Sequence, residues 1–255
     1  MNGARGVLLA TVFGISACSS GQSASPRPTT KTRRAPTTTE PSTTSTTTAS
    51  STDAVLAPPL LPLFPFQSEQ EARAWTPSGP HPEYADPSGT ALAFTSFLGY
   101  AEVDHVVTSV TDAKGRHVAV GSFVPGTSTL TTAAVVHLVR YGPGAGAPWE
   151  VVGTDDADFA LTRPAYGATI GSPLTVGGRI TGVDENIRIH VQQLHANRFL
   201  GEFCCVPAGG VGSAWTASVS FAAPTDPVLM VSASTGGHTR RIERFTVNAV
   251  KARTP

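Results

Sequence analysis

Charged side chains are scarce in this sequence. Only 14% of its 255 residues are Asp, Glu, Lys or Arg, and 18 acidic side chains balance 18 basic ones. A chain without net charge has no long-range attraction for the phosphates of nucleic acid. We therefore expect no nucleic-acid partner.

Catalytic and metal-binding motifs are also missing. The sequence has no Gly-x-Ser-x-Gly or Ser-x-x-Lys nucleophile motif, and no His-x-x-x-His or Cys-x-x-Cys pair of the kind that binds zinc. The acidic group at 154–158 lacks the spacing of a calcium loop, so we interpret it as a solvated turn. The Gly-rich stretch 207–212 lacks the Lys of a phosphate loop and favours a hairpin turn. These absences predict a protein that is not an enzyme and has no cofactor or metal site.

No apolar run is long enough to cross a membrane, which takes about 20 residues. The run from Gly6 to Ile15 is about half that length and is followed by Ser16, Ala17 and Cys18. This order is typical of a secretory signal peptide. Together with Cys18 it resembles the lipobox of bacterial lipoproteins. The resemblance implies cleavage after residue 17, a lipid on the Cys18 sulfur, and attachment to the extracytoplasmic face of the cell membrane. The alternative is an ordinary signal peptide with an incidental cysteine.

Ser and Thr dominate the stretch after Cys18, where they make up 20 of the 34 residues from Ser19 to Thr52. Such a composition cannot form a core, so we predict a disordered tether over residues 18–63. The apolar, Pro-rich end of this stretch, Val55 to Phe66, is expected to pack onto the folded part.

Two cysteines remain, Cys204 and Cys205, and they are adjacent. Thiols outside the cytoplasmic membrane tend to be oxidised, which favours a vicinal disulfide between them. Free buried thiols and intermolecular or redox use remain alternatives.

Residues 64–163 have the pattern of a small α+β domain. Ser68 and Asp86-Pro87 are expected to begin two helices, and Gly99 to end the second. Four strand-like stretches separated by turn signals follow, which predicts an antiparallel sheet. If this sheet curves around a pocket, Phe94, Phe97, Val120 and Val135 are the residues expected to line it.

Residues 164–255 contain strand-like stretches about every ten residues and no convincing helix, a pattern typical of an all-β sandwich. Ile187, Ile189 and Val191 alternate with Arg188, His190 and Gln192. One face of this strand should therefore be buried and the other wet.

The second region also carries a family-level pattern. Ser172-Pro173-Leu174-Thr175-Val176-Gly177-Gly178 is followed by an alternating strand and by Trp215 and Phe221, six residues apart. This order is similar to the immunoglobulin-like domain associated with bacterial spore-germination proteins. The resemblance covers about a third of the chain and implies an immunoglobulin-like sandwich without catalytic residues.

These observations favour a non-enzymatic surface lipoprotein that presents its immunoglobulin-like module to an envelope protein or to the cell wall. The alternative is a carrier of a small apolar ligand, held in the pocket of the α+β domain. A wall-degrading hydrolase would require a cleft with a perturbed acid, base or nucleophile, which the sequence does not indicate.

Overall fold

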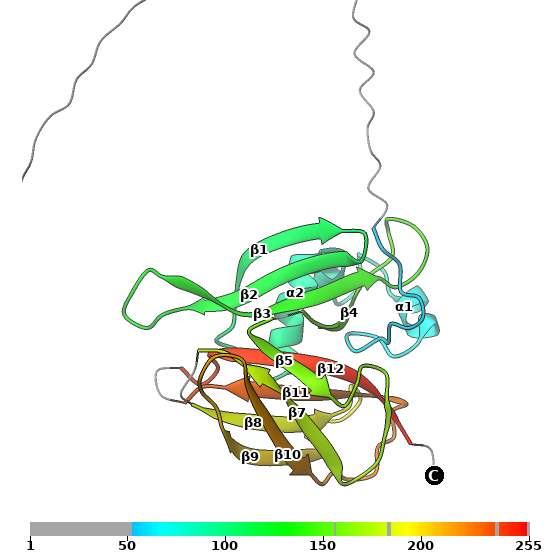
Figure 1. Cartoon of the computed structure of the whole chain (residues 1–255). Coiled ribbons are helices and arrows are strands. Elements are labelled where there is room, and N and C mark those ends of the chain that lie inside the picture. The colour runs from blue at the N-terminus through cyan, green and yellow to red at the C-terminus, as the bar shows by residue number, and fades with distance from the viewer. Residues whose placement is uncertain (1–52, 156, 183–184, 238–239, 254–255) are drawn as a thin grey trace, which may run out of the picture. The chain divides into compact units, whose positions relative to one another are not determined.

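The computed structural model describes residues 53–155, 157–182, 185–237 and 240–253, and most of its regular structure is β-strand (Figure 1). The leader, Cys18 and the Ser/Thr-rich stretch to residue 52 lie outside the described residues. No helix within the described part of the chain has the length and apolar composition needed to cross a membrane.

The two predicted helices begin at the predicted caps. Helix α1 spans Glu69–Ala74, and the Ser68 hydroxyl accepts a hydrogen bond from the Glu71 backbone N–H at 3.2 Å. Helix α2 spans Pro87–Phe97, and the Asp86 carboxylate accepts from the Gly89 N–H at 2.8 Å. These bonds satisfy backbone donors that have no partner within the helix. A short 3₁₀ helix, η1 (Pro82–Ala85), lies between the two helices. Gly99 follows α2 with a φ of 80°, a conformation that glycine adopts without strain.

Four consecutive strands form the predicted antiparallel sheet. They are β1 (His105–Asp112), β2 (Gly115–Phe123), β3 (Leu130–Arg140) and β4 (Trp149–Thr154), and they lie side by side in chain order. Alternate residues of β2 and β3, such as Val118, Val120 and Val136, face α2 and form a core with Phe94.

The chain from Asp53 to Phe66 lies against this sheet, as predicted for its apolar end. Arg140 exchanges backbone hydrogen bonds of 2.7 and 2.8 Å with Leu56 and Ala54. Val151 does the same with Leu63 and Phe64, at 3.0 and 2.7 Å. Leu63 is fully buried, so residues 53–63 belong to the folded unit and not to the predicted tether.

Two further sheets pack face to face (Figure 1). The five-stranded sheet has the order β6 (Thr169–Ile170), β12 (Arg244–Ala252), β11 (Val228–Thr235), β8 (Asn186–Gln192), β9 (Gly201–Pro207). The three-stranded sheet has the order β10 (Ser213–Val219), β7 (Leu174–Ile180), β5 (Phe159–Arg163). Aliphatic residues of both sheets, among them Val176, Ile189 and Val231, fill the space between them.

Two details of this region differ from the sequence expectations. The Gly-rich stretch 207–212 is not a hairpin turn, because it joins β9 of one sheet to β10 of the other. Strand β5 ends at the expected domain boundary after residue 163, yet it pairs with β7 in the three-stranded sheet. One strand of the sandwich therefore comes from the region that precedes residue 164.

The two hydrophobic cores meet at strands β11 and β12. Met230, Phe245 and Val247 belong to the same core as Phe94 of α2. Their sequence neighbours Leu229 and Val231 point to the other side and join the core of the sandwich. The described residues from Asp53 onward accordingly belong to one compact unit.

Candidate functional site

A cleft lies on the face of the five-stranded sheet that is turned toward α2, above strands β8 and β9. Near β12 this face is apolar and packed under α2, whereas on β8 it carries Arg188, His190 and Gln192, as the alternation predicted. His190 and Gln192 are nevertheless buried, at 6% and 4% exposure, because the chain after α2 and the segment after β8 lie over them. The expectation of a wet face is wrong at these two positions.

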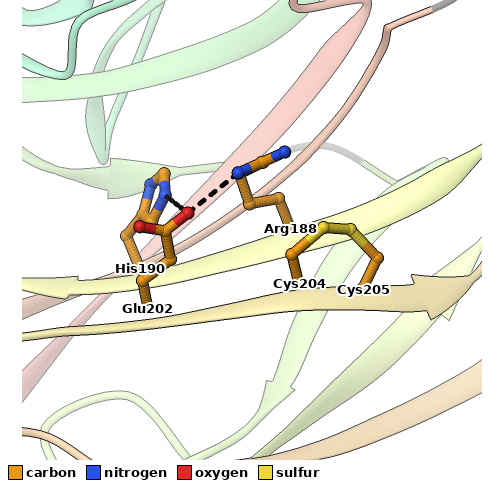
Figure 2. The surroundings of a disulfide bond; sticks show 5 residues. All are labelled: Arg188, His190, Glu202, Cys204 and Cys205. Carbon is orange, nitrogen blue, oxygen red and sulfur yellow. Dashed lines mark hydrogen bonds and ion pairs between the residues drawn. A yellow bond between two sulfur atoms is a disulfide. The ribbon is translucent and has the colours of Figure 1, made fainter.

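Charged side chains of β8 and β9 form a small network on this face (Figure 2). Arg188 Nη1 donates to Glu202 Oε1 at 2.8 Å, and His190 Nε2 lies 3.7 Å from the same oxygen. Both partners of the Arg188–Glu202 pair are about half exposed, so the pair adds little stability. Its carboxylate and guanidinium remain available to a ligand.

His190 connects this network to an exposed aromatic ring. The imidazole stacks on Phe199, with ring centroids 3.8 Å apart and planes 9° from parallel. Burial lowers the pKa of His190 and outweighs the opposing attraction of Glu202. His190 is therefore a neutral support for Phe199, whose exposed fraction is 38%.

Cys204 and Cys205 are joined by a disulfide on β9, beside this network (Figure 2). The pairing register skips one residue here, since Ile187 pairs with Val206 but Arg188 with Cys204. This β-bulge explains how two adjacent cysteines rise from the same face of the strand. Cys205 forms part of the cleft wall.

The cleft has a polar and an apolar compartment. The polar compartment has a volume of about 510 Å³ and is bounded by Tyr100, Arg188, His190, Glu202 and Arg241. The apolar compartment, about 560 Å³, is bounded by Phe97, Leu98 and Leu194. Leu98, Gly99 and Phe199 line both compartments, so the exposed Phe199 ring lies where the two meet.

Two buried polar atoms at the cleft lack a hydrogen-bond partner among the described residues. They are Thr235 Oγ1 in the polar compartment and Gln192 Oε1 in the apolar one. Buried polar atoms in native proteins are almost always satisfied by protein, water or ligand. Thr235 and Gln192 thus place polar groups in the cleft wall, but these two atoms are themselves covered in this structure.

The residues expected to line an apolar pocket in the first region do not do so together. Phe94 and Val120 are fully buried in the core, and Val135 lies on the opposite face of β3 from the core residue Val136. Only Phe97 reaches a cavity, and that cavity is the apolar compartment of the cleft.

Sequence reasoning missed the cleft because it did not identify β9. Without that strand, nothing indicated that Glu202 would lie beside Arg188 and His190. Sequence reasoning also did not identify a cluster that could hold a metal ion. It consists of His117, His137 and Asp155 at the four-stranded sheet. Histidines on neighbouring strands meet regardless of their separation in the sequence.

Comparison with known proteins gives no further guide, because no family model, curated protein or solved structure matches this chain.

Proposed function

We propose that this chain is a non-enzymatic lipoprotein of the bacterial envelope, which binds an envelope protein or the cell wall through the cleft over β8 and β9. The observation that carries the proposal is the cleft itself. It combines a half-exposed ion pair with an exposed aromatic ring that stacks on a buried histidine. Exposed aromatic rings beside polar groups are typical of binding hot spots.

Two sequence features support the placement outside the cytoplasm. The leader and Cys18 resemble a lipobox, which would attach the chain to the membrane through a lipid. The bonded pair Cys204–Cys205 suits an oxidising compartment. We further propose that the two face-to-face sheets form the immunoglobulin-like module suggested by the sequence resemblance.

Mass spectrometry of the protein purified from its native membrane tests the location. We expect a lipid adduct on an amino-terminal Cys18, and a mass two daltons below that of the dithiol for the Cys204–Cys205 peptide. An unmodified Cys18 would remove the anchor from the proposal.

Retention on two immobilised materials tests the cleft: solubilised envelope protein and insoluble cell-wall polymer. The full chain is compared with Phe199→Ala and with Phe123→Ala. Phe123 is a matched control, since it is also exposed and its ring contacts a histidine, His105, at 4.7 Å. We expect Phe199→Ala to reduce retention on one material at least tenfold and Phe123→Ala to leave it unchanged. Equal retention of both variants would refute binding through the cleft.

The apolar compartment favours a second candidate function, carriage of a small apolar ligand. Its volume lies within the usual range for ligand pockets. Extraction of the natively purified protein with organic solvent should then release one ligand per chain, and Leu194→Asp should abolish that recovery.

A further inference from the structure

Two histidines and one aspartate meet on the face of the four-stranded sheet that points away from α2. His117 of β2 and His137 of β3 are directly paired across the ladder, so their side chains leave the same face. Their rings stack with centroids 4.6 Å apart. Asp155 follows β4 immediately, and one ligand atom from each of the three residues lies within 4.8 Å of the others.

The far nitrogen of each imidazole is held by an acceptor. His137 Nε2 lies 3.0 Å from the Lys114 carbonyl oxygen, which can only accept, so Nε2 carries the hydrogen. His117 Nε2 lies 3.1 Å from Asp112 Oδ1. That oxygen is itself fixed by the backbone N–H groups of Lys114 and Gly115, at 2.7 and 3.1 Å. Metal-bound histidines usually donate their second N–H to a carboxylate or a carbonyl in this way.

The near nitrogens converge on one carboxylate oxygen. Asp155 Oδ2 lies 2.8 Å from His117 Nδ1 and 3.4 Å from His137 Nδ1. With hydrogens on both Nε2 atoms, all three atoms are acceptors and require a positive charge among them. A proton on one nitrogen leaves the other histidine facing an acceptor, whereas a metal ion serves all three atoms.

The two separations from the Asp155 oxygen are close to those around a small divalent ion. Zinc bound to His and Asp at 2.0–2.1 Å in a tetrahedron separates neighbouring ligand atoms by about 3.3 Å. The separation of 3.4 Å between His137 and Asp155 already has this value, and the separation of 2.8 Å between His117 and Asp155 needs to open by about 0.5 Å. The Asp155 side chain, 46% exposed, has room to make that shift, while the histidine rings are held at 16% and 12% exposure.

We propose that His117 Nδ1, His137 Nδ1 and the Asp155 carboxylate bind a divalent first-row transition ion of the zinc class. Imidazole and carboxylate ligands in this number match zinc sites that keep a fourth position for water. Such a site would link β2, β3 and the end of β4. It involves none of the cleft residues and does not depend on the function proposed for them.

Calorimetric titration of the metal-stripped full chain with ZnCl₂ tests the site. Cys18→Ser is included in every sample so that this thiol cannot bind the ion. We expect one equivalent to bind, and Co²⁺ to bind at the same site with the visible absorption of a four-coordinate ion. Asp155→Asn and His137→Ala should each weaken zinc binding at least 100-fold. Asp112→Ala, which removes only the support of His117, should weaken it about 10- to 100-fold.

His105→Ala is the matched control. His105 lies on the same sheet, and its ring contacts a carboxylate, Asp104, and the phenyl ring of Phe123. The control should keep full zinc affinity. Asp155→Asn changes a half-exposed side chain, so its circular dichroism and metal-free melting temperature should match those of the parent chain, which separates loss of binding from loss of folding. Absence of saturable binding, or unchanged affinity in Asp155→Asn and His137→Ala, would overturn the proposal.

Discussion

The two hydrophobic cores of this protein are filled by different kinds of side chain. The core around α2 is rich in aromatic rings, including Phe64, Phe94 and Trp149. The core between the three- and five-stranded sheets consists mainly of Ile, Val and Leu from strands, such as Ile187 and Val231. The aromatic core brings together distant segments, since Phe64 packs on Phe94 at 5.7 Å and Tyr100 on Phe245 at 5.1 Å. The aliphatic core follows the local alternation of its strands.

Strand β11 shows how the two cores are combined. All eight of its residues are buried, because one face contributes to each core. An ordinary sandwich strand alternates buried and exposed residues. The loss of alternation in β11 therefore identifies the layer that both cores share.

The largest expected effect on stability comes from truncating a large side chain in either core. Phe94→Ala in the aromatic core and Ile189→Ala in the aliphatic core should lower the free energy of unfolding by about 3–5 and about 2–5 kcal/mol, respectively. Since β11 and β12 belong to both cores, each variant should shift one common transition. Guanidinium unfolding followed by tryptophan fluorescence and by far-UV circular dichroism measures this. Val110→Ala, at an exposed site on β1, is the control and should change stability by less than about 0.5 kcal/mol. Two separate transitions would show that the cores are independent.

A second prediction concerns a completely buried carboxyl group beside the aromatic core. Glu150 on β4 is completely buried, and burial raises its pKa well above the ordinary value despite a hydrogen bond of 3.2 Å from the Phe66 N–H. The folded state thus holds a proton that the unfolded state releases as the pH rises. Stability from this group is complete below the ordinary pKa of Glu and is lost as the pH rises toward the folded-state pKa.

Glu150→Gln removes this dependence while keeping an acceptor for the Phe66 N–H. Relative to the variant, the parent chain should lose up to about 1.4 kcal/mol of unfolding free energy per pH unit above the ordinary pKa of Glu. Melting temperatures measured from pH 4 to pH 9 test this. The melting temperature of Glu69→Gln, a change on the exposed helix α1, should vary with pH in the same way as that of the parent chain. If the melting temperatures of Glu150→Gln and of the parent chain varied with pH in the same way, Glu150 would not hold a proton in the folded state.

The smallest expected effect concerns the disulfide on the aliphatic side. Cys204 and Cys205 are neighbours, so their bond closes the shortest loop that two residues can form. A short loop restricts the unfolded chain little, and Cys204→Ser with Cys205→Ser should cost only about 1 kcal/mol. Unfolding with and without a reductant provides the same comparison in the parent chain. A loss as large as that of Ile189→Ala would give the disulfide a structural role in the aliphatic core.

The sequence predicted best where the signal is local. The caps at Ser68 and Asp86 concern residues within a few positions of one another, and the structure confirms them. The alternation in β8 gave the right division of residues between the two faces but not the burial of His190 and Gln192. Strands β5 and β9 were missed because β9 contains the two cysteines and Pro207, and β5 lies beside the acidic turn. Neither segment has the regular apolar alternation of a strand.

The candidate sites were less predictable than the fold. The cleft depends on Phe199 stacking on His190, and the metal cluster on β2 and β3 placing His117 opposite His137. The histidine pair follows from strand register, which is fixed only when the sheet assembles, and the Phe199 contact depends on how the connection between β8 and β9 folds back over β8. The sequence reasoning looked for ligand spacings within single elements and so could not find ligands on different strands.

The position of Asp53 has a mechanical consequence. A pull on the chain from its amino-terminal side enters the folded unit at this residue, whose carboxylate lies 3.2 Å from Arg140 Nε and 3.8 Å from Arg116 Nε. The load then passes through the backbone bonds of Ala54 and Leu56 to Arg140, the last residue of the inner strand β3, before it reaches α1. The contacts of Asp53, Ala54 and Leu56 therefore bear tension before the buried Leu63 and Phe64 do, so the end of the sheet is loaded before the aromatic core.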